Sequence, residues 1–359
     1  GDPSQGVLDG VRMLAARHPD LLRHTESVLH ATTLVINAII ERKGARTGLV
    51  TTRGFRDVLE IGREMRYDLY DIQLEFPKPI VPRHRRTEVT ERVLENGTVR
   101  TPLDTQDVAA AAATLTAEGV ESVAICFLHS YANPQHEQRA RGELERLMPG
   151  IPISISSDVL PEIREYERTT TTVANAYVKP LASRYTARLV DGLRDLGFTR
   201  RLLIMLSSGG MTSVETAAEY PVRIVESGPA AGAIAAEHVG RVSGFPEHVL
   251  AFDMGGTTAK GCVIENGHID MASTFESARV HRFRKGSGIP LRIPVIDIME
   301  IGAGGGSIAT LDGMGLLQVG PESAGALPGP ACYGRGGTKP TVSDADLVLG
   351  YLDATHFLG

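Results

Sequence analysis

The chain has 359 residues, a length that predicts more than one domain. Hydrophobic residues make up 42% of it and charged residues 22%, the balance of a folded globular protein rather than a disordered one. Its net charge is −6, and no stretch approaches the roughly 18–20 apolar residues of a membrane span, so we expect neither nucleic acid nor a membrane as a partner.

The three cysteines lie far apart in the sequence. Cys126, Cys262 and Cys332 form no C-x-x-C pair, the spacing typical of a metal or redox site. The first residues show neither the basic region nor the apolar region of a signal peptide. We therefore expect a reduced, cytoplasmic protein.

The first part of the chain alternates helical and strand patterns. Helical periodicity covers residues 4–17 and residues 34–42, and a short helix is expected over 55–63. Residues 47–52 have the pattern of a buried strand, and the Asn96-Gly97 dipeptide predicts a hairpin. The densest basic cluster, RHRR at residues 83–86, is interpreted as a solvated turn rather than a phosphate-binding track.

A regular α/β stretch follows, in which strands alternating with helices predict parallel pairing and helices packed on the sheet. The expected elements are a helix over 104–117, a strand over 122–127, a helix beginning at Asn133-Pro134, a strand over 151–155 and a long helix over 169–196 that Pro180 kinks or splits.

A domain boundary is expected near residue 195, where this helix ends. It divides the chain into residues 1–195 and residues 196–359. Beyond it we expect strands over 201–206, 222–226 and 249–253, and a helix over 229–239. Near the end of the chain, Ser343 or Asp344 is expected to be the N-cap of a further helix.

The most informative motif follows the strand over 249–253. It reads DMGGTTAK, from Asp253 to Lys260, and it belongs to a hairpin predicted over 249–265. Two adjacent glycines, Gly255 and Gly256, let backbone N–H groups approach phosphate oxygens without steric obstruction. The alternative is a plain hairpin whose glycines only turn the chain.

The side chains of this motif also suit a phosphate group. The hydroxyls of Thr257 and Thr258 can donate hydrogen bonds, and Lys260 adds a cation. Asp253 offers a hard oxygen to Mg²⁺, through water, because Mg²⁺ gives up its hydration shell reluctantly. The motif therefore predicts a site for Mg²⁺ and a polyphosphate such as that of ATP.

Two further places are candidate sites. Four of the five residues 302–306 are glycines, so Gly304, Gly305 and Gly306 are expected either to line the phosphate or substrate site or to form a structural turn. His30, Thr32, Thr33 and Asn37 lie at a strand-to-helix junction, where a substrate or phosphate contact and a simple N-cap are equally good interpretations.

A small-residue helix opening with SGPAAGA at residues 227–233 precedes the hairpin. This order resembles the ATPase core shared by actin, heat-shock chaperones and sugar kinases. The resemblance implies an α/β fold of the two-lobed actin-like ATPase (ribonuclease H-like) type, with mixed sheets and flanking helices and with ATP held between the lobes.

Other segments carry a more specific resemblance, which runs along the whole chain. They are residues 30–38 (HATTLVINA), 48–59 (GLVTTRGFRDVL), 160–169 (LPEIREYERT), 301–309 (IGAGGGSIA) and 328–334 (PGPACYG). Together they resemble the hydantoinase A / 5-oxoprolinase family.

This resemblance implies an ATP-dependent subunit of an oligomeric enzyme that acts on a small cyclic amide (a hydantoin, 5-oxoproline or a lactam). In the acetone carboxylase branch it would act on a ketone. ATP would phosphorylate the carbonyl oxygen, and a subunit or domain of the hydantoinase B type would complete the reaction. Asp253 would then be the catalytic residue and magnesium ligand, and the ATP-binding residues would be Gly255, Gly256, Thr257, Thr258, Lys260, Gly304, Gly305 and Gly306.

The chain also departs from the family pattern. No D-x-G-G-T-F-T-D phosphate loop precedes residue 1, and no glycine-rich adenosine-binding segment follows, so we expect a piece of a longer polypeptide with an incomplete nucleotide site. Ala259-Lys260 stands where many 5-oxoprolinase-like members carry Thr-Asp or Ser-Asp. This difference argues against the 5-oxoprolinase branch. The open alternatives are a ketone carboxylase subunit, a kinase for a sugar-like alcohol, and a structural fragment without chemistry of its own.

Overall fold

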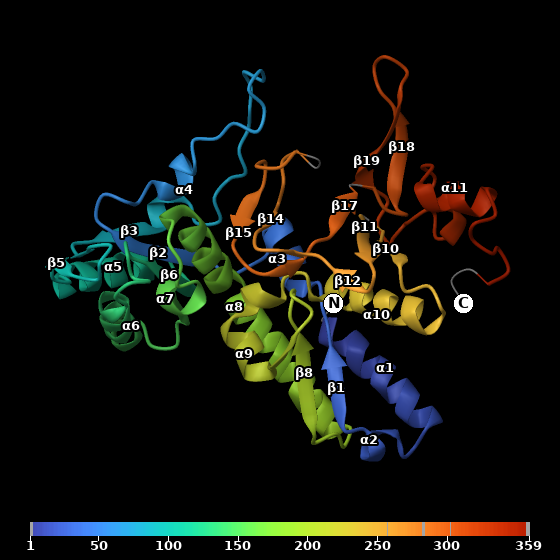
Figure 1. Cartoon of the computed structure of the whole chain (residues 1–359), viewed down its shortest axis with the longest axis horizontal. Coiled ribbons are helices and arrows are strands. Elements are labelled where there is room, and N and C mark those ends of the chain that lie inside the picture. The colour runs from blue at the N-terminus through green and yellow to red at the C-terminus, as the bar shows by residue number, and fades with distance from the viewer. Residues whose placement is uncertain (1–2, 257, 282–283, 302, 357–359) are drawn as a thin grey trace. The chain divides into compact units, whose positions relative to one another are not determined.

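The computed structural model describes residues 3–256, 258–281, 284–301 and 303–356. The chain divides into two compact units, Gly1–Ala230 with Met271–Val295, and Ala231–Asp270 with Ile296–Gly359. Both units mix helices with strands (Figure 1). The predicted boundary near residue 195 lies at the end of a long helix inside the first unit, and the division into two domains at that point stays a prediction.

Helices and strands have the following bounds. The helices are α1 (Pro3–Arg17), α2 (Leu21–His24), α3 (Leu34–Ile40), α4 (Val58–Ile61), α5 (Thr105–Ala117), α6 (Gln135–Leu147), α7 (Ser156–Val159), α8 (Glu165–Asp195), α9 (Val214–Glu219), α10 (Ser227–Val242) and α11 (Val342–Val348), with 3₁₀ turns η1 (Arg83–Arg85), η2 (Pro221–Ile224) and η3 (Ala331–Tyr333). The strands are β1 (Ser27–His30), β2 (Thr47–Thr52), β3 (Arg86–Val89), β4 (Arg92–Val93), β5 (Val99–Thr101), β6 (Ser122–Cys126), β7 (Ile153–Ile155), β8 (Arg201–Met205), β9 (Met211–Ser213), β10 (His248–Met254), β11 (Ala259–Glu265), β12 (His268–Ile269), β13 (Met271–Ala272), β14 (Phe275–Ser277), β15 (Ile289–Leu291), β16 (Val295–Ile296), β17 (Met299–Ile301), β18 (Ser307–Leu311) and β19 (Leu317–Ser323).

A parallel sheet with strand order β3-β2-β6-β7 organises the first unit, as the alternating pattern predicts. All residues of β2 and β6 are buried, which is typical of a sheet covered on both faces. Val50 and Ile125 pack in one cluster with α5 and α6, whereas Leu49 and Ala124 pack in another with α8. The alternation of side chains along each strand thus places different helices on the two faces.

The long helix α8 is continuous through Pro180 and begins earlier than the sequence predicts. Its first turns are polar but buried: Glu167 is 2% exposed and Arg168 is 1% exposed. Arg168 donates a hydrogen bond of 2.7 Å to the carbonyl oxygen of Phe127, at the end of β6. The hydroxyl of Thr172 donates to the carbonyl oxygen of Arg168 one turn earlier, at 2.7 Å, so this buried hydroxyl has its partner within the helix.

A second sheet, with strand order β1-β8-β9, also belongs to the first unit. The strand predicted over 222–226 is wrong, because this segment forms the 3₁₀ turn η2. Pro221 opens the turn, and the backbone N–H of Val222 donates to the side-chain oxygen of Asn175 on α8 at 3.3 Å. The apolar side chains of Val222 and Ile224 are buried there, and apolar spacing alone does not distinguish such a turn from a short buried strand.

Asp107, in the first turn of α5, fixes this helix to the loop after β3. Its carboxylate accepts hydrogen bonds from the backbone N–H of Thr90, at 2.9 Å, and from the guanidinium of Arg53, at 2.7 Å. Hydrogen bonding from Thr90 and then from Arg53 lowers the pKa of Asp107 to about 2. The carboxylate therefore stabilises the fold in its charged form.

Replacing Asp107 with Asn is expected to lower the free energy of unfolding at neutral pH. A carboxyl group whose pKa is lower in the folded state stabilises the fold above its ordinary value of 3.8 and loses this effect as the pH falls toward about 2. The difference between the wild-type chain and D107N should therefore shrink over that interval, as measured by urea unfolding at several pH values. The variant E145Q, at an exposed position of α6, is the control and should show no such convergence.

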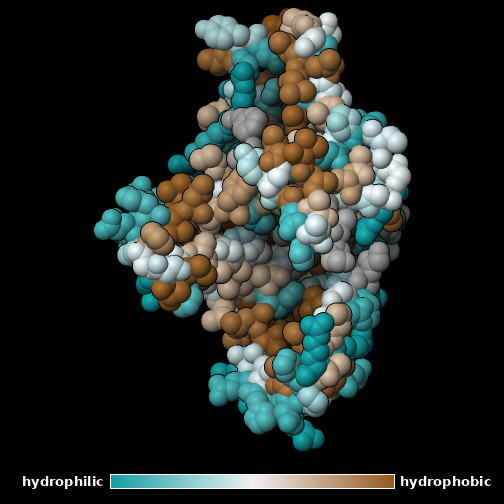
Figure 2. Space-filling model, turned by 90° about the vertical axis from the view of Figure 1, so that its right-hand side faces the viewer, coloured by the Kyte–Doolittle hydropathy of each residue, from teal (hydrophilic) through white to brown (hydrophobic). Residues whose placement is uncertain are grey.

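The second unit is built on antiparallel strands. The predicted hairpin is confirmed as β10 paired with β11, and β12 and β17 also pair with β11. A further hairpin, β18–β19, carries exposed apolar side chains that include Leu311, Met314 and Leu317. Hydrophobic surface is visible on the face of the molecule shown in Figure 2.

None of the helices in the described part of the chain combines the length and the apolar character that a membrane crossing requires.

Candidate phosphate-binding site

The turn between β10 and β11 carries the predicted phosphate-binding motif. Antiparallel pairing places Asp253, near the end of β10, opposite Lys260 on β11. The backbone N–H of Gly255 donates to the carbonyl oxygen of Thr258 at 2.9 Å and closes the turn. Asp253 and Gly256 are exposed, whereas Thr257 lies outside the described residues.

The second glycine-rich loop lies directly against this turn. The N–H of Gly305 donates to the carbonyl oxygen of Gly255 at 2.9 Å, and the N–H of Gly306 donates to that of Gly256 at 2.8 Å. Pairing of β17 with β11 brings the loop into this place, because the loop begins where β17 ends. The structure therefore joins two motifs that are far apart in the sequence. Gly302 lies outside the described residues.

Close backbone approach explains why the second loop needs glycines. A Cβ atom on Gly306 would lie 2.9 Å from the carbonyl oxygen of Gly256 and 2.8 Å from the Oγ of Ser323. A Cβ atom on Gly305 would lie 2.6 Å from the Oγ of Ser343. A side chain at Gly306 would therefore push the loop away from the turn, whereas one at Gly305 would press on Ser343.

The start of α11 supports the same loop from its other side. The backbone N–H of Ser343 donates to the carbonyl oxygen of Gly305 at 2.8 Å. Thr341, rather than the predicted Ser343 or Asp344, is the N-cap of α11, and it forms a capping box with Asp344. Asp344 also accepts a hydrogen bond of 2.7 Å from the backbone N–H of Cys332. Burial, and then the carboxylate of Asp344, raise the pKa of the Cys332 thiol to about 11, so it stays protonated at neutral pH.

The donors of the two loops have different roles. The amide groups of Gly305 and Gly306 are used in bracing the turn, and that of Gly304 donates to the Oγ of Ser307 at 3.0 Å. Among the described residues, the amide groups of Gly256 and Thr258 have no acceptor, and neither has the Thr258 hydroxyl. The turn thus presents donors to an incoming anion while the second loop holds the turn in shape.

The chemistry of the donor set indicates which metal ion the turn suits. Within the part of the chain that the structure describes, no three His, Cys, Asp or Glu side chains are grouped to hold a metal ion. Asp253 is the single carboxylate between residues 253 and 260. One carboxylate fits Mg²⁺, which completes its coordination with phosphate and water, whereas a Zn²⁺ site needs three or four protein ligands.

The junction around His30 lies in the first unit. The ring Nε2 of His30 and the hydroxyl of Tyr185 form a hydrogen bond of 2.7 Å. Burial lowers the pKa of this histidine. The Oγ of Ser227, at the start of the small-residue helix α10, donates to the carbonyl oxygen of Thr32 at 2.9 Å and accepts from its N–H at 3.0 Å. Thr33 is the N-cap of α3 by position, but its side chain makes no capping hydrogen bond. Both interpretations of this junction, a substrate or phosphate contact and a simple N-cap, therefore stay predictions.

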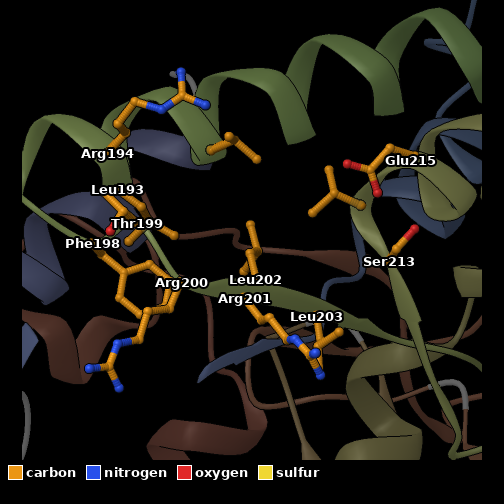
Figure 3. Close-up of a pocket in the computed structure, with 12 residues that line it drawn as sticks. Leu193, Arg194, Phe198, Thr199, Arg200, Arg201, Leu202, Leu203, Ser213 and Glu215 are labelled. Carbon is orange, nitrogen blue, oxygen red and sulfur yellow. The ribbon is translucent and has the colours of Figure 1, made fainter. Parts of the chain in front are cut away.

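A cavity of about 460 Å³ lies in the first unit between α8, β8 and α9. Figure 3 shows Arg194 and Arg200 on one side of it and Ser213 and Glu215 on the other. Aliphatic side chains such as Leu193 and Leu202 also line it. Among the lining residues that the structure describes, Arg194 pairs with Asp191 of its own helix at 3.3 Å.

Family models match most of the chain. The model described as the hydantoinase/oxoprolinase N-terminal region matches residues 1–148, and the model described as hydantoinase/oxoprolinase matches residues 168–359. The chain therefore belongs to the hydantoinase/oxoprolinase family, which confirms the resemblance found in its motifs.

Individual relatives agree with this assignment. An uncharacterized protein of Methanocaldococcus jannaschii is 45% identical over 90% of this chain and 48% of its own length. Caprolactamase subunit alpha of Pseudomonas jessenii is 36% identical over 100% of this chain and 51% of its own length. The chain spans about half the length of the curated relatives it matches.

Solved structures show the fold. The ATP-dependent caprolactamase of Pseudomonas jessenii matches with a TM-score of 0.77 and 36% identity, over 98% of this chain and 50% of the matched chain. Nucleotide-free acetone carboxylase matches with a TM-score of 0.76 and 29% identity, over 93% of this chain and 47% of the matched chain. These relatives confirm the predicted α/β class of the actin-like ATPase type, with mixed sheets and flanking helices.

Proposed function

We propose that this chain is part of an enzyme that uses ATP to activate the carbonyl group of a cyclic amide for hydrolysis. The observation that carries the proposal is the pairing of Gly255 and Gly256 with Gly305 and Gly306, which builds a braced turn with open donors beside Asp253. A relative of this chain is named an ATP-dependent caprolactamase, and caprolactam is a cyclic amide. The specific amide is left to experiment.

Each residue of the turn has a role in this proposal. The amide groups of Gly256 and Thr258 would bind phosphate oxygens, with the hydroxyls of Thr257 and Thr258 beside them, and Lys260 would neutralise charge that develops during phosphoryl transfer. Asp253 would hold Mg²⁺, which when bound screens the phosphate charges. Gly304, Gly305 and Gly306 would keep the turn in its binding shape.

Activation of the amide would follow from phosphoryl transfer to its carbonyl oxygen. An amide carbonyl resists attack by water because its nitrogen donates electrons to it. Transfer of the γ-phosphoryl group from ATP to the oxygen releases ADP and makes the carbon more electrophilic. Water then attacks this carbon and the C–N bond breaks, which opens the ring and leaves an acyl phosphate. A second water hydrolyses the acyl phosphate to the carboxylic acid and releases phosphate.

A partner subunit or domain of the hydantoinase B type is part of the proposal. Relatives are named alpha, beta and gamma subunits, which supports an enzyme made of several subunits. We propose a cytoplasmic hetero-oligomer in which the partner completes the reaction on the activated carbonyl.

A second candidate function is ATP-dependent carboxylation of a ketone. The structural match to acetone carboxylase favours it, at nearly the same TM-score as the caprolactamase match. Ala259-Lys260 at the phosphate turn also departs from the Thr-Asp or Ser-Asp pair of many 5-oxoprolinase-like sequences. In this alternative ATP would activate the ketone oxygen in the same way, with bicarbonate as the second substrate.

The two functions differ in the substrate that stimulates release of ADP and phosphate by the complete enzyme with Mg²⁺ and ATP. We expect ATP turnover that is stimulated by caprolactam, hydantoin or 5-oxoproline, together with the ring-opened product by mass spectrometry. Turnover only with acetone and bicarbonate would establish the carboxylase instead. Absence of both turnover and nucleotide binding would leave the chain as a structural fragment.

A further inference from the structure

The hairpin formed by β18 and β19 in the second unit has one apolar face. Its cross-strand pairs place four apolar side chains on the same side of the hairpin, namely Leu311, Leu317, Ala309 and Val319. The pair between them, Thr310 with Gln318, points to the other side. This alternation is typical of a sheet that packs one face against a neighbour.

This apolar face is open to solvent in the described part of the chain. Leu311 and Leu317 are each 70% exposed, and Met314 and Leu316 at the tip are exposed as well. Figure 1 shows the two strands extending beyond the other strands of their unit. Together with Val319, these side chains leave on the order of 600 Å² uncovered, the upper end of what a single patch on a monomeric protein shows. A two-stranded hairpin alone is only marginally stable in water, so covering this face would stabilise it.

The tip of the hairpin is preformed, and its charge is used within the turn. Asp312 is the one charged residue between positions 307 and 320. Its carboxylate accepts hydrogen bonds from the backbone N–H of Met314 at 2.8 Å and from that of Leu316 at 2.9 Å. Nε2 of Gln318 also donates to it, at 3.3 Å. Association through this hairpin therefore requires neither the ordering of a loose loop nor the burial of an unpaired carboxylate.

The composition and the area of this face suit a second copy of the chain. Because the apolar side chains carry no charge, two identical faces meet without like-charge repulsion. Identical chains most often assemble by a two-fold contact in which each copy offers the same patch, and such interfaces are more apolar than the rest of the surface. Covering the patch on both copies would remove about 1,200 Å² from solvent, which reaches the range of a specific, stable interface.

We propose that the apolar face of β18–β19 is the interface of a homodimer, in which Leu311 and Leu317 of one copy pack against the same face of the second copy. The two hairpins then form a small two-layer sheet, with the layers about 10 Å apart and the apolar side chains between them. This contact is made by the second unit and does not depend on the use of ATP by the chain.

Sedimentation velocity of the 359-residue chain, over about 1 to 100 µM, tests the proposal. We expect a reversible equilibrium between monomer and dimer. L317Q should weaken dimerisation about tenfold or more, because the apolar contact is lost and the amide has to be desolvated. L311Q changes the opposite residue of the same pair and serves if L317Q does not fold. The control is L69Q, since Leu69 is 74% exposed in the first unit and this variant should dimerise as the wild-type chain does.

Charged variants distinguish a homodimer from other occupants of the face. L317E and L317K should each stay monomeric alone, because the two-fold contact brings like charges together, whereas their equimolar mixture should form more dimer than either variant alone. All variants should keep the wild-type circular dichroism spectrum, since the substituted side chains are exposed. A chain that is monomeric at every concentration would overturn the proposal and leave the face to a different polypeptide. Equal dimerisation of L317Q and the wild-type chain, larger aggregates in place of a dimer, or no gain on mixing would overturn it as well.

Discussion

Replacing Asp253 with Ala is expected to abolish ATP turnover in the complete enzyme while the fold survives. Asp253 is exposed at the end of β10, and among the described residues it makes no hydrogen bond or ion pair that the fold would lose. Its carboxylate is the one hard oxygen ligand that the turn offers to Mg²⁺. We expect a loss of turnover of about 10³-fold or more, measured as ADP release with saturating ATP.

Asp270 provides the matched control for this prediction. It is an exposed aspartate of the same unit that lies outside the turn, and D270N should retain wild-type turnover. Thermal unfolding followed by circular dichroism should give the same midpoint for D253A and for the wild-type protein. Turnover by D253A near the wild-type rate would remove Asp253 from the catalytic role proposed for it.

Replacing Gly306 with Ala is expected to separate the second glycine-rich loop from the turn. The added methyl group would lie 2.9 Å from the carbonyl oxygen of Gly256, which is backbone and cannot rotate aside. The hydrogen bond from the N–H of Gly306 to this oxygen, at 2.8 Å, would lengthen or break. We expect a destabilisation of about 1–3 kcal/mol and a loss of nucleotide affinity of about tenfold or more, because the turn loses its support.

Gly313 tests whether this effect comes from the close approach. It lies in the exposed tip of the β18–β19 hairpin, and a Cβ atom there would meet nothing within 4 Å. G313A should therefore bind nucleotide as the wild-type protein does, in the same titration with ATP and Mg²⁺. If G306A and G313A bind equally well, the second loop does not support the phosphate turn.

Much of the local structure is predictable because apolar patterns, capping residues and turn glycines are visible in the sequence. The strand at Thr47–Thr52 has the predicted bounds, and the helix predicted over 104–117 is confirmed as Thr105–Ala117 with Asp104 as its N-cap. Asp104 accepts a hydrogen bond from the N–H of Gln106 at 2.8 Å, a local contact that needs no information from elsewhere in the chain. The β10–β11 hairpin follows in the same way from two apolar runs joined by adjacent glycines.

Other features were mispredicted because distant contacts decide them. Val222 and Ile224 form a turn rather than a strand, since Asn175 on α8 accepts the N–H of Val222 and the apolar side chains fill the core. The RHRR cluster was expected to be solvated, yet Arg86 is buried against Glu60 and Val81. In both places the spacing of residues along the chain is compatible with the predicted structure and with the observed one, so the spacing cannot distinguish them.

The sequence by itself determined the family, the α/β class and the two glycine-rich segments, because motifs, hydrophobic periodicity and turn residues are local properties of the chain. Only the tertiary structure decided that Gly305 and Gly306 brace the turn at Gly255 and Gly256, and that Arg86 is buried against Glu60 and Val81. The reason is physical: β17 has to pair with β11 before the loops can meet, and such long-range pairing is set by packing that local spacing does not encode.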